Sequence, residues 1–177
     1  LNHKQIFERN EFILPSEFSK SKFNFIENKI PKSKKGIVTS GVSYCYAKEA
    51  LEILGEKNIP VLKIGTPYPF PTDLAKSFLA DVEEVLVIEE LDPVIENELL
   101  KLCGKNHLEN KIHGKLTKEI PEAGEYSVEI AKQVIAKFLG LELSENKIEL
   151  PPLPVRPPVL CAGCPHRASF YAVKQAM

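Results

Sequence analysis

The sequence predicts an α/β fold, a small doubly wound and mostly parallel sheet flanked by extended segments. Two observations predict this fold. Between about residues 36 and 143, short apolar runs alternate with amphipathic helical stretches, which is typical of parallel strands joined by crossover helices. The run Val-Leu-Val-Ile at 85–88 is apolar at every position, as expected of a strand that helices cover on both faces.

Three strands and a weaker edge strand are predicted within this region. Residues 36–41, 61–65 and 82–89 are rich in Val, Ile and Leu, the residue types that strands favour. Residues 111–116 repeat the pattern more weakly. The three prolines of 66–71 remove backbone donors, so this stretch should join neither a sheet ladder nor a helix.

Four helices are predicted between and after the strands. The first has an apolar face over residues 47–54 and ends at Gly55, because a glycine tolerates the left-handed conformation that often ends a helix. The second runs from Asp73 to about Leu79, with Thr72 as its N-cap. The third is predicted to begin with Pro93, directly after Asp92, and the fourth spans 128–139.

The chain is predicted to have four parts. Residues 1–34 are polar and irregular and are interpreted as a connecting segment, and residues 35–143 form the α/β domain. Residues 144–159 are interpreted as an extended linker, because the five prolines at 151–158 favour a semi-rigid spacer. Residues 160–177 then open a second domain.

Composition limits the classes of function. The chain has 177 residues, 23 basic and 24 acidic side chains and a formal charge of -1, which predicts neither a nucleic-acid partner nor an anionic membrane. Apolar runs are too short to span a bilayer. Four scattered cysteines do not form a disulfide framework in a chain of this length, so a cytoplasmic location is expected.

Ligands of doubly wound sheets bind where the parallel strands end. Here those ends carry residues 40–43, 65–67 and 89–92. The small residues at 40–43 permit a phosphate site at a helix N-terminus, although a turn whose hydroxyls cap the helix is the simpler interpretation. The acidic group at 89–92 permits metal binding or acid–base chemistry. The favoured interpretation is structural, with Asp92 capping the next helix.

A cysteine motif near the C-terminus offers the most specific chemistry. Cys161 and Cys164 have the spacing that lets two thiolates reach one metal or iron–sulfur cluster, with Gly163 and His166 beside them. The pair is half a site, because zinc and a [4Fe–4S] cluster each take four ligands. A redox dithiol and a purely structural pair remain alternatives. The other two cysteines, Cys45 and Cys103, are predicted to be buried core thiols.

Two stretches together resemble one enzyme family. Residues 159–167, Val-Leu-Cys-Ala-Gly-Cys-Pro-His-Arg, followed by Phe-Tyr-Ala at 170–172, resemble the opening of the thiamine-diphosphate domain of 2-oxoacid:ferredoxin oxidoreductases. The Cys-Pro-His-Arg form resembles the indolepyruvate ferredoxin oxidoreductase α subunits in particular. Residues 36–44, 65–69 and 87–93 resemble the middle domain of that subunit, which has the fold of the transketolase C-terminal domain.

The resemblance implies an enzyme that oxidatively decarboxylates arylpyruvates such as indolepyruvate to acyl-CoA thioesters. It implies thiamine diphosphate, magnesium and iron–sulfur clusters as cofactors. It also implies a β subunit, ferredoxin, coenzyme A and a 2-oxoacid as partners and substrates. By position in the motif, Gly163, Cys164 and His166 would line the thiamine-diphosphate site, and Cys161 and Cys164 would bind a cluster.

The resemblance also predicts what this segment can do by itself. The acid that activates thiamine in the family would precede residue 1, and the metal–diphosphate motif would follow Met177. The segment alone is therefore expected to be a catalytically inactive scaffold. Alternatives are a small-anion-binding α/β module, a small metal- or redox-regulated protein, and a segment of a pyruvate or other 2-oxoacid ferredoxin oxidoreductase.

Overall fold

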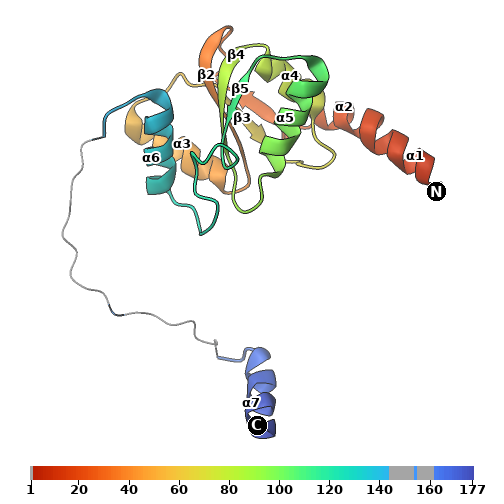
Figure 1. The fold of residues 1–177 in the computed structure, drawn as a ribbon, viewed down its shortest axis with the longest axis vertical. Coiled ribbons are helices and arrows are strands. Elements are labelled where there is room, and N and C mark those ends of the chain that lie inside the picture. The colour runs from red at the N-terminus through yellow and green to blue at the C-terminus, as the bar shows by residue number, and fades with distance from the viewer. Residues whose placement is uncertain (1, 144–153, 155–161) are drawn as a thin grey trace. The chain divides into compact units, whose positions relative to one another are not determined.

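The structure is a computed structural model that describes residues 2–143, 154 and 162–177. The chain divides into two compact units, Leu1–Leu143 and Ser144–Met177. The first unit is a sheet with helices on both faces (Figure 1). Most of the predicted linker at 144–159 lies outside the described residues, so the predicted domain boundaries stay a prediction.

The first unit contains a five-stranded sheet in the order β1-β3-β2-β4-β5. Strands β2 to β5 pair in parallel, and only β1 is antiparallel, to β3. The predicted α/β class with a mostly parallel sheet is therefore confirmed. The strands are β1 (Phe25–Glu27), β2 (Ser33–Ser40), β3 (Val61–Ile64), β4 (Val82–Ile88) and β5 (Lys111–His113).

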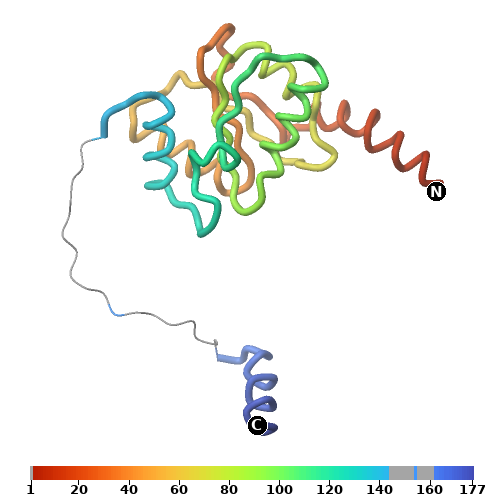
Figure 2. Tube along the Cα trace, in the orientation of Figure 1, coloured from red at the N-terminus to blue at the C-terminus, as the bar shows by residue number. Residues whose placement is uncertain are grey.

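Helices cover both faces of this sheet, and the traces in Figures 1 and 2 show the two layers. Helices α3 and α6 pack together on one face, and α4 and α5 lie on the other. The arrangement confirms the doubly wound prediction. The helices of this unit are α1 (His3–Glu8), the π-helix η1 (Arg9–Ile13), α2 (Leu14–Ser19), α3 (Ser43–Leu54), α4 (Thr72–Leu79), α5 (Val94–Asn106) and α6 (Val128–Leu139).

Two hydrophobic cores lie on opposite faces of the sheet. In β2, Val38 packs toward the α4 and α5 side with Phe78 and Leu99, and its neighbour Ile37 packs toward the α3 and α6 side with Ile135. All five side chains are almost completely buried. Successive strand side chains point to opposite faces, so a strand that is apolar at consecutive positions supplies both cores.

Local signals predicted the end of α3 but not the cap of α4. Helix α3 ends at Gly55 in the left-handed conformation, as expected, with φ 75°. Helix α4 begins at Thr72, which was predicted to cap it, but no side chain of its own N-terminus does so. Instead, the Ser19 hydroxyl of α2 accepts hydrogen bonds from the backbone N–H of Asp73 and Leu74 at 3.1 and 3.2 Å. The cap therefore comes from a residue far away in the sequence.

Residues 1–34 are not the irregular segment that their polarity predicted. Residues 3–19 are helical without interruption, and residues 25–27 form the edge strand β1. The helix begins with a reciprocal capping box between Asn2 and Gln5, and Pro15 lies where the π-helical segment 9–13 meets α2. Strand β1 exists because β3 offers it a ladder, which a local pattern cannot show. No helix in the described parts of the chain is both long and apolar enough to cross a membrane.

Candidate functional site

The carboxyl ends of β2, β3 and β4 were expected to form a site, and β4 carries the most polar residues. Glu89 follows β4 directly and is almost completely buried. Its carboxylate accepts the backbone N–H of Ile95 and Glu96 at 2.8 and 2.9 Å. Burial raises the pKa of Glu89, and the two N–H donors and Lys115 oppose this rise only in part. Glu89 therefore caps helix α5.

The structure corrects the assignment of this cap. Asp92 was predicted to cap α5, but its side chain is exposed, and only its backbone carbonyl takes part, accepting the N–H of Val94 at 2.8 Å. Pro93 is the N-cap residue rather than the first helical residue. The capping carboxylate of Glu89 lies six residues before Ile95, whose N–H it accepts. Local capping rules consider only residues next to the helix start.

A second buried carboxylate, that of Glu96, makes similar contacts nearby. Glu96 accepts the backbone N–H of Lys115 at 2.9 Å and of Leu116 at 3.2 Å, so it joins α5 to the loop after β5. Gly114 lets this happen, because a Cβ there would lie 2.6 Å from Cδ of Glu96. The Lys115 ammonium is itself buried and donates to the Leu91 carbonyl. The loops after β4 and β5 are thus tied together.

Tyr126 also contacts these residues. Its backbone N–H donates to the Glu90 carboxylate at 3.1 Å, and its hydroxyl donates to the Pro121 carbonyl at 2.6 Å. The Lys115 ammonium lies 5.2 Å from its ring centre. Burial, together with the charges of Glu89, Glu90 and Glu96, raises the pKa of Tyr126 to about 12. The phenol therefore stays protonated at physiological pH and acts here as a hydrogen-bond donor.

Glu89 and Glu90 thus have structural contacts, as the favoured interpretation expected, but the cap that it assigned to Asp92 is wrong. Each of Glu89, Glu90 and Glu96 already accepts backbone N–H groups of the fold. Sequence analysis missed Glu96, Lys115 and Tyr126. One available signal was the position of Glu96 between Ile95 and Leu99, on the buried face of the helix, where a carboxylate must be paired.

The end of β3 is held by a residue that sequence analysis also missed. The Asn24 side-chain carbonyl accepts the N–H of Gly65 and Thr66 at 2.7 and 3.1 Å. Its amide donates to the Phe18 carbonyl at 2.8 Å and the Thr66 hydroxyl at 2.6 Å. The buried Asn24 thus joins the segment between α2 and β1 to the sheet edge where ligands of such folds bind.

The turn after β2 has the backbone expected of a tight strand-to-helix connection. Gly41 has φ 53°, and α3 begins two residues later with Val42 as its N-cap residue. No side-chain hydroxyl caps this helix, so the expected hydroxyl cap is wrong. Ser43 and Thr39 are buried, and the Thr39 hydroxyl has no hydrogen-bond partner among the described residues. The phosphate site suggested for this turn stays a prediction.

The cysteine motif lies in the second unit. Gly163 has φ 79°, and Cys164 and His166 follow at the start of helix α7 (His166–Ala176). The Cys164 Sγ lies 3.3 Å from Nδ1 of His166. Cys164 is half-buried, and Gly163 and His166 are exposed. Cys161, the other predicted cluster ligand, lies outside the described residues.

The donors around this motif do not complete a cofactor site within the described residues. One thiol and one imidazole are in contact, whereas a [4Fe–4S] cluster takes four protein ligands. No group of three or more His, Cys, Asp or Glu side chains that could hold a metal ion occurs in the described parts of the chain. The half-site of Cys161 and Cys164 stays a prediction, because Cys161 lies outside the described residues.

The two remaining cysteines differ from each other. Cys103 is buried in the core beside α4, as predicted, and burial raises the pKa of its thiol. Cys45 was predicted to be buried and is exposed. It lies two residues before Ala47 in α3, and two residues rotate a helix by about 200°. Cys45 therefore faces away from the core that Ala47 joins.

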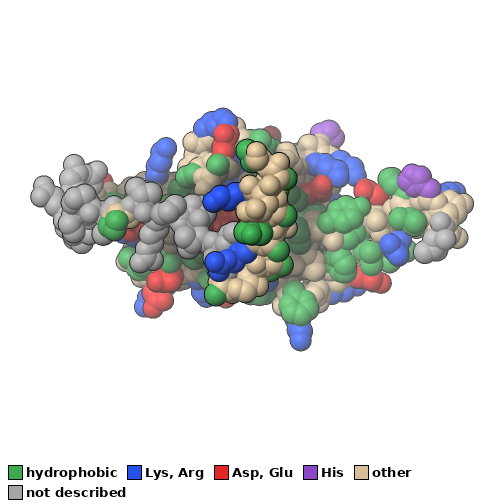
Figure 3. All heavy atoms as spheres, turned by 90° about the horizontal axis from the view of Figure 1, so that it is seen from below, with side chains coloured by type: hydrophobic (Ala, Val, Ile, Leu, Met, Phe, Trp, Pro, Cys, Tyr) green, Lys and Arg blue, Asp and Glu red, His purple; other side chains and the backbone are tan. Residues whose placement is uncertain are grey.

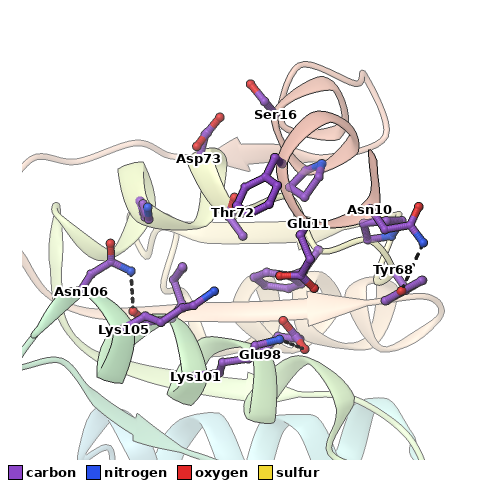
Figure 4. A pocket seen from close by; sticks show the side chains of 16 residues that line it. Asn10, Glu11, Ser16, Tyr68, Thr72, Asp73, Glu98, Lys101, Lys105 and Asn106 are labelled. Carbon is purple, nitrogen blue, oxygen red and sulfur yellow. Dashed lines mark hydrogen bonds and ion pairs between the residues drawn. The ribbon is translucent and has the colours of Figure 1, made fainter. Parts of the chain in front are cut away.

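A cleft of about 590 Å³ lies between the N-terminal helices and helices α4 and α5 (Figure 4). Lys76, Lys101 and Lys105 line it together with three acidic residues and the exposed Phe12 and Tyr68. The acidic residues are Glu11, Asp73 and Glu98. Because the formal charges balance, the cleft has no marked preference for an anion.

Comparison with known proteins adds what the geometry does not decide. No protein-family model matches the chain. It is 44% identical over 156 residues to the indolepyruvate oxidoreductase subunit IorA of Methanothermobacter marburgensis, which covers 88% of this chain and 25% of that protein. The chain is a homologue of one segment of IorA. It is also 41% identical to IorA of Pyrococcus abyssi over 98% of this chain and 28% of that protein.

The fold itself is shared with a solved structure. The structure matches a 2-oxoglutarate:ferredoxin oxidoreductase from Magnetococcus marinus, solved with 2-oxoglutarate, coenzyme A and succinyl-CoA bound. The TM-score is 0.53 at 15% identity, over 76% of this chain and 23% of that one. This likeness concerns the fold. The chain spans about a quarter of the length of the IorA relatives it matches.

Proposed function

We propose that this chain is a segment of the α subunit of an indolepyruvate-type 2-oxoacid:ferredoxin oxidoreductase. The enzyme would decarboxylate an arylpyruvate, transfer the acyl group to coenzyme A and pass two electrons to ferredoxin. The observation that carries the proposal is the 44% identity to IorA over 156 residues. The mostly parallel sheet, shared with a 2-oxoglutarate:ferredoxin oxidoreductase, supports it.

Within that enzyme, residues 2–143 would act as a scaffold. Their buried carboxylates already accept backbone N–H groups of the fold, which leaves little capacity for acid–base chemistry or metal binding. The loops after β2, β3 and β4 would face the cofactor-binding domain or the β subunit, because the carboxyl end of a parallel sheet is where such folds bind partners.

The motif at 161–166 would join a cofactor site only in the complete enzyme. Gly163, Cys164 and His166 would line the thiamine-diphosphate site, or Cys161 and Cys164 would supply half of the ligands of a cluster. Bound thiamine diphosphate would supply a carbanion-stabilising thiazolium, with magnesium on its diphosphate. Since the described residues do not fit a complete site, we infer that the segment alone is inactive. A cytoplasmic enzyme would agree with its cysteine content.

The activity can be tested on the complete subunit with its β partner. Reduction of ferredoxin should depend on both coenzyme A and indolepyruvate, and the acyl-CoA product should be found by mass spectrometry. Pyruvate and 2-oxoglutarate serve as competing substrates and should give a much lower kcat/KM. If pyruvate or 2-oxoglutarate is preferred, the family assignment survives and the arylpyruvate assignment does not. Absence of turnover with every 2-oxoacid contradicts the proposed activity.

The inactivity of the segment has its own test. Isothermal titration of the 177-residue chain with thiamine diphosphate and Mg²⁺ should show no binding, because a diphosphate held by a metal needs oxygen ligands that the described residues do not bring together. The complete subunit is the positive control. Micromolar binding by the segment would contradict the proposal that it is only a scaffold.

A further inference from the structure

Residues 3–19, here called the N-terminal arm, expose several large apolar side chains. Ile6, Phe7, Phe12 and Ile13 are 38%, 53%, 69% and 53% exposed. The arm extends from the body of the unit (Figure 1), and hydrophobic side chains gather over that part of the molecule in the space-filling view (Figure 3). Single exposed apolar residues are ordinary, but several along one helical segment mark an interaction surface.

The arm lacks the packing that normally stabilises a helix of this length. Neither α1 nor η1 has a buried residue. Isolated helices of fewer than about 12–15 residues are marginal in water, and most helical stability in proteins comes from burying one face. The arm is attached at its inner end, where Pro15 is buried and Ser19 caps α4, and by a hydrogen bond from Asn10 to the body. Residues 3–13 therefore bury no side chain against the rest of the unit Leu1–Leu143.

The apolar surface continues from the arm onto the body. Phe12 lines the cleft shown in Figure 4 together with Tyr68, which is 73% exposed. Asn10 joins the two elements, because its side-chain amide donates to the Tyr68 hydroxyl at 3.5 Å. The cleft balances three lysines against three acidic residues. Aromatic side chains with balanced charge suit a polypeptide surface better than a small anion.

We propose that the N-terminal arm is a docking surface that another part of the same polypeptide covers in the complete subunit. This rests on the proposed function. The alignment to IorA of Pyrococcus abyssi covers 98% of this chain, so the arm belongs almost entirely to the shared segment. That relative continues well beyond the segment, because the aligned part is 28% of its length. A surface in the same chain has an effective concentration of about millimolar, which a second copy or a separate subunit would have to exceed.

Hydrogen–deuterium exchange tests the proposal on the complete subunit, without its β partner. Amides of residues 3–19 should exchange at least about tenfold more slowly in the complete subunit than in the 177-residue chain, because docking suppresses local opening. Protection in the 177-residue chain that rises with its concentration would show that a second copy covers the arm. Protection that appears only when the β subunit is added would show that the partner covers it. Either result overturns the proposal.

Substitutions in the complete subunit identify the surface. Phe7→Asp and Phe12→Asp should each restore fast exchange to the arm while the amides of β2 and β4 stay protected. Ile53→Asp is the matched control, since Ile53 is 59% exposed on α3, and it should leave exchange in the arm unchanged. If neither Phe variant changes exchange in the arm, the proposal is wrong. Because exchange does not depend on turnover, a subunit inactive toward arylpyruvates would contradict the proposed function and still report on docking.

Discussion

The Glu89 carboxylate accepts the backbone N–H of Ile95 at 2.8 Å and so joins the end of β4 to the first turn of α5. The same side chain accepts the N–H of Glu96, whose own carboxylate holds the loop after β5. Two buried carboxylates in series therefore set the shape of this edge of the sheet. A carboxylate at a helix N-terminus is also favoured by the helix dipole.

Glu89→Ala should destabilise the fold more than Asp92→Ala. We expect a loss of about 1–3 kcal/mol in the free energy of unfolding for Glu89→Ala, because it removes a cap and leaves two buried N–H groups without partners. Asp92→Ala should stay within about 0.5 kcal/mol, as is usual for an exposed side chain. Urea unfolding followed by circular dichroism measures both. Equal losses, or a larger loss for Asp92→Ala, would contradict the assignment of Glu89 as the cap of α5.

The stability that Glu89 contributes should fall as pH rises. Burial raises the pKa of Glu89 above its reference value of 4.5 in the folded protein, so the folded state keeps this proton to a higher pH than the unfolded state does. By linkage, the contribution is complete below the unfolded pKa and decreases until pH exceeds the folded pKa.

The measurement compares wild type with Glu89→Gln, which cannot titrate at this position. The free energy of unfolding of the wild type minus that of Glu89→Gln should decrease as pH is raised above 4.5 and then become constant. Carboxyls such as Glu84, whose pKa the Lys111 ammonium lowers, give the opposite slope and cancel in this difference. A difference that does not change with pH would contradict the raised pKa of Glu89.

Alanine at two glycines should have opposite effects. A Cβ at position 114 would lie 2.6 Å from the Glu96 carboxyl carbon, so Gly114→Ala should cost about 1–3 kcal/mol through overpacking. A Cβ at Gly104, in helix α5, would meet nothing within 4 Å. Gly104→Ala should therefore stabilise by up to about 1 kcal/mol, because alanine loses less backbone entropy. Thermal unfolding distinguishes the two, and a neutral Gly114→Ala would show that Glu96 is free to move.

Alkylation should separate the cysteines by burial. Iodoacetamide reacts with the thiolate, so exposed Cys45 should be modified in the native protein. Cys103 should react only after denaturant is added, since burial both shields its thiol and raises its pKa. Peptide mass mapping assigns the modified sites. Rapid native modification of Cys103 would mean that the core around α5 opens readily.

Much of the fold could be predicted from the sequence, because its signals are local. The apolar run at 85–88 predicted β4, and Gly55 predicted the end of α3. Helix α6 was predicted with the bounds it has, since its apolar residues recur every three to four positions. Such signals act within a turn or a strand, where near neighbours in sequence are also neighbours in space.

Some residues of the candidate site could be predicted from the sequence and others could not. The motif with Gly163, Cys164 and His166 is contiguous, so the sequence alone could relate it to an enzyme family. Residues such as Asn24, Glu96 and Lys115 carry no such pattern. Their roles arise from partners far along the chain, as between Asn24 and Gly65 or between Glu96 and Lys115.

By itself, the sequence determined the α/β class, the order of most strands and helices, and the family to which its motifs point. Only the tertiary structure decided that Glu89 rather than Asp92 caps α5 and that residues 25–27 form an edge strand. The physical reason is that hydrogen-bonding groups in a loop or at a sheet edge are satisfied by whatever side chain or strand folding brings close. That partner has no necessary relation to the local sequence.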